Sequence, residues 1–384
     1  MALNAYIDRL YRLQSWQSSL QLKTNLSDAS ADLVTPDEMV SFPFKLRQSN
    51  YGSYFYSENV ESIDRIKDCF GVPRDFGLHV SNSGTAFVTT IGLLLLTLKI
   101  KNVVVVGTPY PTWLKIFNLL GINLIYSGNW RLDVQGAPHP CAFLVHSPKF
   151  GSSDPLDDGA LAAVPAAMRH PHDVVIFDCI LEPYFHRIIE MADCLPNSLY
   201  LFSPLKLIGL NSHKVTFLSC KGTISEPLFD TVFSMGESLN YSTQCAIQFL
   251  AGNRYQQLRD SSIATLASSA ELVMSIAVQT NCATNAHAPY LFCKMTVPDI
   301  PMHPFLQLEH HFAIYKRTGV VFIPNGFYEW SEAGPMSFRV NLGKRKDILE
   351  RALPALINDL RSFFAAEENR AAMVDGRKAD LRTL

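Results

Sequence analysis

Short runs of apolar residues alternate with amphipathic segments along most of the chain. Runs of this length without polar alternation predict strands that are buried on both faces, as in parallel sheets. The helix-like segments between them predict helices on both faces of that sheet. The pattern therefore predicts a large α/β domain. Its predicted central strands are Val103–Val106, Ala142–Val145, Val174–Phe177 and Ser198–Phe202.

The pattern changes after about residue 245. Apolar positions from about 245 to 280 recur at helical spacing, which predicts one long amphipathic helix that links two domains. Pro289–Met295, Gly319–Ile323 and Phe338–Leu342 predict strands of a smaller α+β domain. A helix from about Lys346 to Phe364 is expected to close that domain.

The same changes of pattern give predicted domain boundaries. Residues 1–45 form an N-terminal segment that joins the small domain, and residues 46–265 form the large domain. Residues 266–366 form the small C-terminal domain. Residues 367–384 are charged and nearly free of large apolar side chains, so we expect an exposed tail there.

Composition and charge narrow the class of protein. The chain has 384 residues, of which 48% are hydrophobic, enough for two domains with cores of their own. A formal net charge of -2 argues against nucleic acid as a partner and favours a small-molecule ligand. The eight cysteines stand singly without a C-x-x-C pair, which predicts reduced thiols, a cytoplasmic location and no metal site.

Neither of two apolar segments has the features of a membrane span or an export signal. The first 20 residues mix Asp8, Arg9 and Arg12 with apolar positions, so they lack the apolar core of a signal peptide. The apolar run Ile91–Leu98 is too short to span a bilayer. We therefore expect no membrane partner.

Polar residues follow the predicted strands, where ligands bind in open α/β sheets. Gly107, Ser147, Asp178 and Ser203 occupy such positions. Asp178 ends an apolar strand, where a carboxylate needs a charged or hydrogen-bonding partner. A protonated ring nitrogen of a ligand would be such a partner, and a helix N-cap is the alternative role.

Small residues precede the helix-like run Phe87–Leu98. Ser83, Gly84 and Thr85 stand where a helix N-terminus presents free backbone N–H groups, an arrangement that binds phosphate. A plain N-cap is the alternative. The sequence has neither a Walker lysine after this turn nor a G-x-G-x-x-G motif, which argues against a nucleotide.

Two aromatic residues follow the strand Val103–Val106. Tyr110 and Trp113 lie in a loop that contains two prolines, and either could offer its ring to a flat ligand at the edge of the sheet. Either could equally seal the core beneath the loop.

Lys206 lies in a turn with apolar neighbours, among them Pro204 and Leu207. An apolar surround lowers the pKa of a lysine amine and makes it a nucleophile near neutral pH, so Lys206 is a candidate for a Schiff base. An ordinary lysine between a strand and a loop is the alternative.

Over residues 40 to 345 these dispersed motifs together resemble the fold-type I pyridoxal phosphate enzymes of the aspartate aminotransferase superfamily (aminotransferase class I/II). The resemblance implies pyridoxal 5'-phosphate as the cofactor and the type I fold of those transferases. It implies that Ser83, Gly84 and Thr85 bind the phosphate and that Tyr110 stacks on the ring. Asp178 would pair with the ring nitrogen, and the Ser203-x-x-Lys206 segment would carry the Schiff-base lysine.

Three further residues take roles from the resemblance. Lys214 stands where the family has a phosphate-binding arginine, and it keeps the charge without the bidentate fork. Arg339 resembles the arginine that binds the substrate α-carboxylate. Tyr51, close to Tyr54 and Tyr56, resembles the tyrosine that reaches the phosphate of the neighbouring subunit, so the resemblance implies a homodimer with shared sites.

The chain departs from the family pattern at two positions. Phe150 replaces an asparagine and Leu181 replaces a tyrosine, both of which steady the phenolic oxygen of the cofactor in that family. The electronics of the site are therefore expected to be atypical. The loop Asn325–Gly334 and the N-terminal segment are expected to set the choice of substrate.

The resemblance implies a cytoplasmic enzyme of amino acid metabolism that acts at Cα of a free amino acid. An aminotransferase is the leading hypothesis for its activity. A lyase, cyclase or oxidase on a specialised amino acid in a biosynthetic pathway is the alternative. A binding protein without activity is a third hypothesis, and the retention of Lys206, Asp178 and Arg339 together argues against it. His79, His146 and His213 flank the motifs and are interpreted as structural histidines.

Overall fold

The computed structural model describes most of the chain, and all structural statements below refer to that part. The described residues are 12–20, 24–27, 32–33, 60–106, 109–127, 138–150, 154–156, 158–192, 194–210, 215–234, 241–301, 308–324 and 334–366. They fall into two compact units. The larger unit takes its described residues from Val34–Phe150 and Asp154–Ser262, and the smaller from Met1–Leu33 and Ile263–Leu384.

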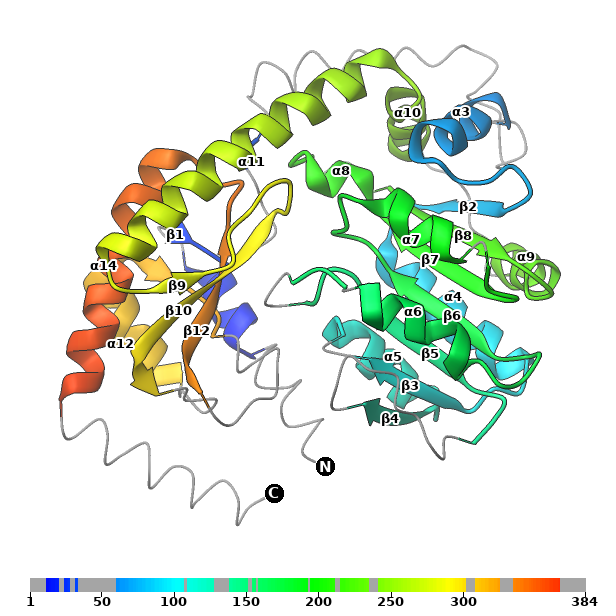
Figure 1. Cartoon of the computed structure of the whole chain (residues 1–384), viewed down its shortest axis with the longest axis horizontal. Helices are drawn as coiled ribbons and strands as arrows, with labels where there is room; N and C mark the ends of the chain where they lie inside the picture. Colours follow the sequence, from blue (N-terminus) through cyan, green and yellow to red (C-terminus); the bar gives the residue numbers. More distant parts are fainter. Residues whose placement is uncertain are drawn as a thin grey trace. The chain divides into compact units, whose positions relative to one another are not determined.

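A seven-stranded sheet forms the centre of the larger unit, in the order β2-β8-β7-β6-β5-β3-β4 (Figure 1). Only β8 runs antiparallel to its neighbours, so the other six strands end at the same edge of the sheet. The prediction of a mostly parallel sheet is confirmed. The strands are β2 (Gly77–Ser81), β3 (Asn102–Val106), β4 (Asn123–Ser127), β5 (Ala142–His146), β6 (Val174–Asp178), β7 (Ser198–Phe202) and β8 (Thr216–Lys221).

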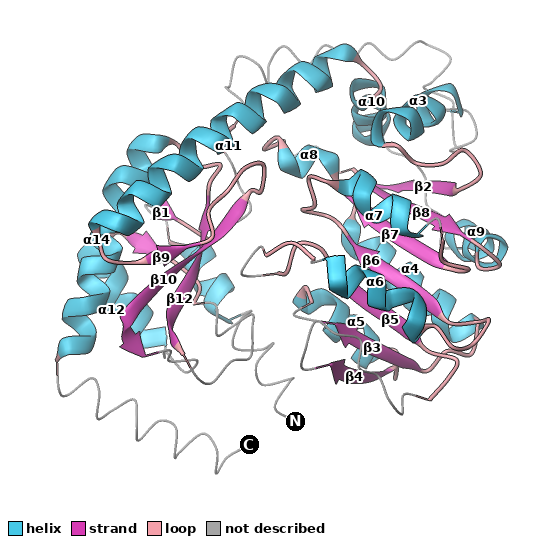
Figure 2. Cartoon of the chain, viewed as in Figure 1, coloured by secondary structure: helices cyan, strands magenta, loops and turns pink. Residues whose placement is uncertain are grey.

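Helices cover both faces of this sheet. Figure 2 shows α6 and α7 in front of the sheet and α4 behind it. Such a two-sided cover explains why β5, β6 and β7 are buried at every position. The helices of this unit are α3 (Val60–Phe70), α4 (Gly84–Thr97), α5 (Pro111–Leu119), α6 (Asp158–Ala167), α7 (Phe185–Ala192), α8 (Pro204–Leu207), α9 (Ser225–Ser234) and α10 (Tyr241–Leu250).

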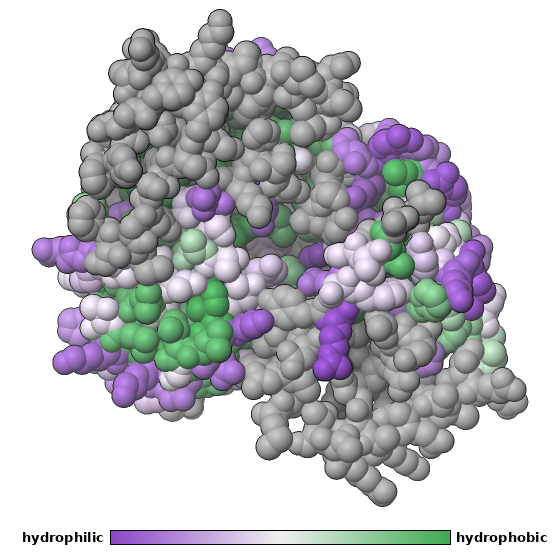
Figure 3. Space-filling view, turned by 180° about the vertical axis from the view of Figure 1, so that it is seen from behind, coloured by the Kyte–Doolittle hydropathy of each residue, from purple (hydrophilic) through white to green (hydrophobic). Residues whose placement is uncertain are grey.

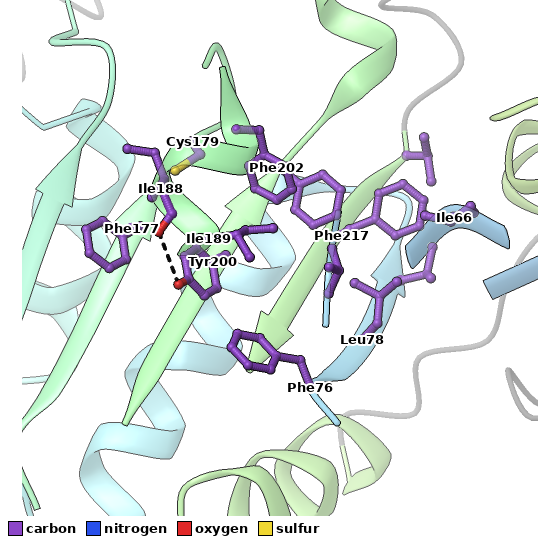
Figure 4. Close-up of a cluster of buried hydrophobic side chains, with 14 of the residues drawn as sticks. Ile66, Phe76, Leu78, Phe177, Cys179, Ile188, Ile189, Tyr200, Phe202 and Phe217 are labelled. Carbon is purple, nitrogen blue, oxygen red and sulfur yellow. Dashed lines mark hydrogen bonds between the residues drawn. The ribbon is translucent and has the colours of Figure 1, made fainter. Parts of the chain in front are cut away.

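The front face of the sheet carries an aromatic core. Successive side chains of a strand point to opposite faces, and in β6 the odd-numbered positions, Val175 and Phe177, belong to this core. Phe177 stacks on Tyr200 with ring centroids 5.4 Å apart, and the Tyr200 hydroxyl donates to the Ile188 carbonyl at 3.5 Å (Figure 4). The even-numbered positions of β6, which end with Asp178, therefore face α4.

The smaller unit contains an antiparallel sheet in the order β12-β10-β9 and a parallel pair of β1 with β11. Residues 12–19 are also helical. The predicted strands and closing helix of this unit are confirmed, although β10 begins three residues later and ends six residues later than predicted, and β12 begins three residues earlier and ends one residue earlier. Its elements are β1 (Thr24–Asn25), β9 (Ala283–Thr284), β10 (Phe292–Pro301), α12 (Leu308–Thr318), β11 (Val320–Val321), β12 (Pro335–Asn341) and α14 (Lys346–Ala365).

The single helix predicted from about 245 to 280 is wrong. Two helices occupy the region, α10 and α11 (Asn253–Gln279), and the chain turns between them at Gly252. A Cβ atom at Gly252 would lie 3.3 Å from the Phe249 carbonyl oxygen, closer than most side chains tolerate. The apolar periodicity continues through the turn, which is why it did not reveal the break.

Helix α11 is long and apolar enough to cross a membrane, by length and composition only. A core helix of a soluble protein passes the same test, and 39% of the most apolar stretch of α11 is buried inside the protein. Arg259 and Glu271 also lie within the helix. These charges favour the interpretation as a core helix that runs from one unit to the other.

His79 generates a prediction about acid stability. Burial, and secondarily the Lys67 cation, lower the pKa of His79 to about 4. Between about pH 6.5 and pH 4, His79 is protonated in the unfolded chain but neutral in the folded chain. The free energy of unfolding therefore falls as the pH drops through this range. The full contribution is about 3 kcal/mol. Urea unfolding at a series of pH values should show a flatter pH dependence for His79→Asn than for the wild type.

The control is His172→Asn, which removes an exposed histidine and should leave the slope unchanged. His311, whose pKa burial lowers to about 3, keeps part of the slope in both variants. An identical slope in His79→Asn and wild type would contradict the prediction.

Candidate functional site

The predicted site residues of the larger unit meet at the edge where the parallel strands end. His146 and Asp178 are register partners at the ends of β5 and β6, so their side chains emerge on the same face. His146 Nε2 consequently lies 3.2 Å from Asp178 Oδ2, and both side chains are buried. Strand pairing thus places a titratable pair where the sequence predicted a single aspartate.

Asp178 is held by two donors. The Trp113 indole N–H donates to Oδ2 at 2.6 Å, and the Ile180 backbone N–H donates to Oδ1 at 3.2 Å. Only 3% of Asp178 is exposed, so these bonds replace water around a charge that would otherwise be costly to bury. The helix that follows β6 begins at Phe185, so Asp178 is not the N-cap that the sequence left open.

Trp113 fills the core and also binds Asp178. The side chain is fully buried, as one of the two roles considered for it requires. Its hydrogen bond to Asp178 was not predicted, although a buried indole N–H usually finds an acceptor. Pro111 at the first turn of α5 fixes the direction in which Trp113 enters the site.

The Nε2 atom of His146 faces two groups at once. The Tyr110 backbone N–H donates to Nε2 at 3.1 Å, and Oδ2 of the Asp178 carboxylate lies 3.2 Å from the same Nε2 atom. Burial lowers the pKa of His146, while Asp178 acts in the opposite direction. A neutral imidazole that accepts from Tyr110 carries its proton on Nδ1, and it cannot also donate from Nε2 to Asp178.

The N-terminus of α4 lies against the same edge. Ser83 is extended and its hydroxyl does not cap the helix, so the first backbone N–H groups have no side-chain acceptor there. No acidic side chain occupies the first turn. A Cβ atom at Gly84 would lie 3.2 Å from Ile180 Cδ1 and 3.6 Å from Thr216 Oγ1. Gly84 therefore permits the close approach that brings an anion-binding helix end beside the Asp178 loop.

Tyr110 stands at the open side of this cluster. It is 39% exposed, and its ring meets the edge of Phe150 at a centroid distance of 5.2 Å. Phe150, which replaces the asparagine of the family pattern, therefore contributes an aromatic edge. The arrangement leaves part of the Tyr110 ring available to a ligand.

The lysine segment forms the short helix α8. Leu205, Ile208 and Leu210 are buried, and these anchors fix the segment on which half-buried Lys206 lies. The Ser203 hydroxyl donates to the Val215 carbonyl at 2.7 Å, so it fastens the segment to the start of β8. The Lys206 carbonyl accepts the N–H of Gly209, whose φ of 80° suits glycine.

Arg339 belongs to β12 of the smaller unit. Its Nε–H and Nη2–H both donate to the Ser27 carbonyl, and the guanidinium lies 4.2 Å from the centre of the Phe292 ring. The side chain is 5% exposed. These contacts fix the plane of the guanidinium, which a carboxylate needs for bidentate binding.

Two predicted cofactor residues, Tyr51 and Lys214, lie outside the described residues. Leu181, the second departure from the family pattern, is half-buried after Asp178. Glu182 was not predicted. Its carboxylate accepts the Ser147 hydroxyl at 2.5 Å and the Tyr184 N–H at 2.9 Å, and it is 4% exposed. In the sequence, the one feature that points to Glu182 as a site residue is its position shortly after the end of a strand.

No protein-family model and no curated protein matches the chain. Solved structures match over almost the whole length. An aminotransferase from Mycobacterium tuberculosis has a TM-score of 0.72 and 13% identity, covering 93% of this chain and 96% of the other. The aspartate aminotransferase of Thermotoga maritima has a TM-score of 0.70 and 14% identity, with coverage of 94% and 97%.

The alanine aminotransferase of Pyrococcus furiosus is similar to the same degree, with a TM-score of 0.70, 15% identity and coverage of 93% and 97%. At such identities the likeness establishes the fold. The chain therefore has the fold of the aminotransferases, as the resemblance of its motifs implied.

The bond from Trp113 to Asp178 generates a second prediction. Trp113→Phe keeps most of the apolar volume but removes one donor from a buried carboxylate, so it should destabilise the protein by roughly 1–3 kcal/mol. Urea unfolding at neutral pH measures the loss. Trp16→Phe is the control, because half-buried Trp16 makes edge contacts to Phe312 and Tyr315. An effect no larger than in this control would contradict the prediction.

Proposed function

We propose that the protein is a pyridoxal phosphate-dependent enzyme that acts at Cα of a free amino acid, and that it is an aminotransferase. The observation that carries the proposal is the buried Asp178 carboxylate, held by Trp113 on the sheet edge that also bears the α4 N-terminus. A carboxylate for the ring nitrogen and a helix N-terminus for the phosphate, on one sheet edge in the fold of the aminotransferases, support the proposal.

The residues at this edge fit the cofactor. The uncapped N-terminus of α4, with Ser83, Gly84 and Thr85, suits a phosphate because it carries no acidic side chain. The half-exposed ring of Tyr110 suits stacking, and Asp178 suits a cationic ring nitrogen. Lys206 is the covalent anchor in this proposal. When bound, the cofactor supplies an electron sink for the charge that develops at the substrate Cα.

The chain itself supplies binding, orientation and proton transfer. Arg339 binds the substrate carboxylate, and its contacts to Ser27 and Phe292 hold the fork in one plane. Once the substrate amine has displaced it, the Nζ atom of Lys206 would remove the proton from the substrate Cα and would deliver it to the carbon of the cofactor that carries the aldehyde. The Trp113 and Ile180 N–H groups hold the Asp178 carboxylate in one orientation through both steps.

We further propose a homodimer with shared sites. Figure 3 shows hydrophobic surface gathered on the face of the larger unit that α4 covers. Leu93 and Leu96 are half-buried on α4, and Leu119, at the end of α5, is 75% exposed. An apolar area of this kind favours a protein partner. The proposal places Tyr51 or a neighbouring tyrosine across that interface.

A role in amino acid metabolism, within a biosynthetic pathway, and a cytoplasmic location complete the proposal. The described cysteines support a reducing compartment, because none of these seven forms a disulfide. The substrate is a small molecule, and the net charge of -2 argues against nucleic acid.

Lys206→Ala tests the covalent anchor. Purified wild-type protein mixed with pyridoxal phosphate should show a near-visible absorbance band, and borohydride should then fix the cofactor on Lys206. The variant lacks the amine, so both the band and the labelled peptide should disappear. Absorbance and peptide mapping by mass spectrometry are the measurements.

The control is Lys221→Ala, which removes a half-buried lysine at the end of β8. It should keep the band and the label. Label on another lysine, or no label on the wild type, would refute the assignment of Lys206.

The alternative of a lyase, cyclase or oxidase is favoured by one observation, the aromatic contact of Phe150 with Tyr110 where the family pattern has an asparagine. The need for a 2-oxo acid separates the two functions. An aminotransferase should stop after one equivalent of amino acid when no 2-oxo acid is added, and should turn over when it is supplied. Sustained turnover without a 2-oxo acid, measured by product release, would contradict the aminotransferase proposal.

A further inference from the structure

A pocket of about 180 Å³ opens in the larger unit on the side of α3 and α7. Its walls come from the end of α3, the loop that follows Asp178, the first turn of α7 and the first turns of α11. The segment on either side of Lys206 completes it, through Ser203, Pro204 and Leu207. The pocket is thus built from segments distant in sequence.

The pocket is separate from the candidate cofactor site. Its lining includes Cys179 and Phe202, which belong to the aromatic core on the front face of the sheet. Figure 4 shows both side chains among the residues of that core. The side chain of Asp178 leaves β6 on the other face. The described lining residues do not include Ser83, Tyr110, Asp178 or Lys206, and Ser203 is the predicted cofactor residue that the pocket shares with that site.

Aromatic rings form the apolar wall of the pocket. Phe70 lies 5.8 Å from Phe202 and 5.7 Å from Tyr255, measured between ring centroids. Phe185 lies 4.2 Å from Phe202. A dry cavity of about 150 Å³ is large enough to bind benzene. The pocket is therefore large enough for an apolar side chain of that size.

Two opposite charges face the same pocket. The Arg259 guanidinium is half-buried, and it makes no hydrogen bond or ion pair with another described residue. Glu182 is a buried carboxylate whose two oxygens are oriented by Ser147 and the Tyr184 N–H. These two bonds are among the interactions of Glu182, and a carboxylate can accept from about four donors. A buried anion and an unpaired cation around an aromatic wall suit a ligand that carries both charges.

We propose that this pocket binds a free amino acid with an apolar side chain as an effector. Glu182 binds its ammonium group, Arg259 binds its carboxylate through the guanidinium fork, and the aromatic wall receives its side chain. Ile180 and Leu207, which line the pocket, are close in sequence to Asp178 and Lys206. Occupancy therefore modulates the reaction, and this consequence alone rests on the proposed function.

Calorimetric titration of the cofactor-loaded protein tests the binding, with L-phenylalanine and L-leucine as probes. Arg259→Gln should weaken the binding about tenfold or more, because it removes a charged hydrogen-bonding partner. Glu182→Gln should weaken it similarly and is the second variant. Arg254→Gln is the matched control, since Arg254 is exposed on the same helix and should change nothing.

Ligands that lack one charge test the two contacts separately. We expect 3-phenylpropionate and phenethylamine each to bind about tenfold more weakly than L-phenylalanine. Equal affinity of L-phenylalanine and 3-phenylpropionate would overturn the role of Glu182. No saturable heat from either amino acid at millimolar concentration would overturn the proposal as a whole.

The variants Lys206→Ala and Arg339→Gln distinguish binding in the pocket from binding at the cofactor site. Heat that persists in both of these variants and is lost in Arg259→Gln belongs to the pocket. Heat that is lost in Arg339→Gln and kept in Arg259→Gln would overturn the proposal. A failure to label Lys206 would defeat the proposed function but leave this result readable, because the titration does not depend on the covalent bond.

Discussion

The buried carboxylate of Asp178 is the constraint on which the site depends. An aspartate that is 3% exposed keeps its charge only where donors replace water. The chain provides Trp113 at 2.6 Å and the Ile180 N–H, and it places His146 at 3.2 Å from the same carboxylate. The strand register of β5 with β6 fixes the histidine, and the entry of α5 fixes the tryptophan. A cationic ring nitrogen would complete the set of partners.

The two faces of the central sheet divide the chemistry. The even-numbered positions of β6, which end with Asp178, lie on the face that also carries the α4 N-terminus. The proposed cofactor, with its phosphate and flat ring, belongs to this face. Odd-numbered positions lead through Phe177 to Cys179 and to the pocket with Arg259 and Glu182. One loop, residues 179 to 183, borders both. A ligand on one face therefore acts on the other through the backbone of this loop, with no need for a change in the sheet.

The fold could be predicted largely from the apolar pattern. The four predicted strands are short runs of mostly apolar residues, and burial on both faces makes such runs easy to recognise in a sequence. β2, β4 and β8 escaped prediction because polar residues such as His79, Asn123 and Ser219 interrupt them. The break between α10 and α11 escaped as well, because it rests on the backbone of Gly252 and leaves the apolar periodicity intact.

The sequence by itself determined which chemical groups follow the strands: a carboxylate at Asp178, an amine at Lys206 and a helix start at Ser83. Strand ends and helix starts are local features, so these groups could be found without a structure. Only the tertiary structure decided their partners. Trp113 and Asp178 are 65 positions apart, and Glu182 meets Ser147 across 35. Such contacts follow from strand order and register, which depend on how all seven strands bury their apolar faces together.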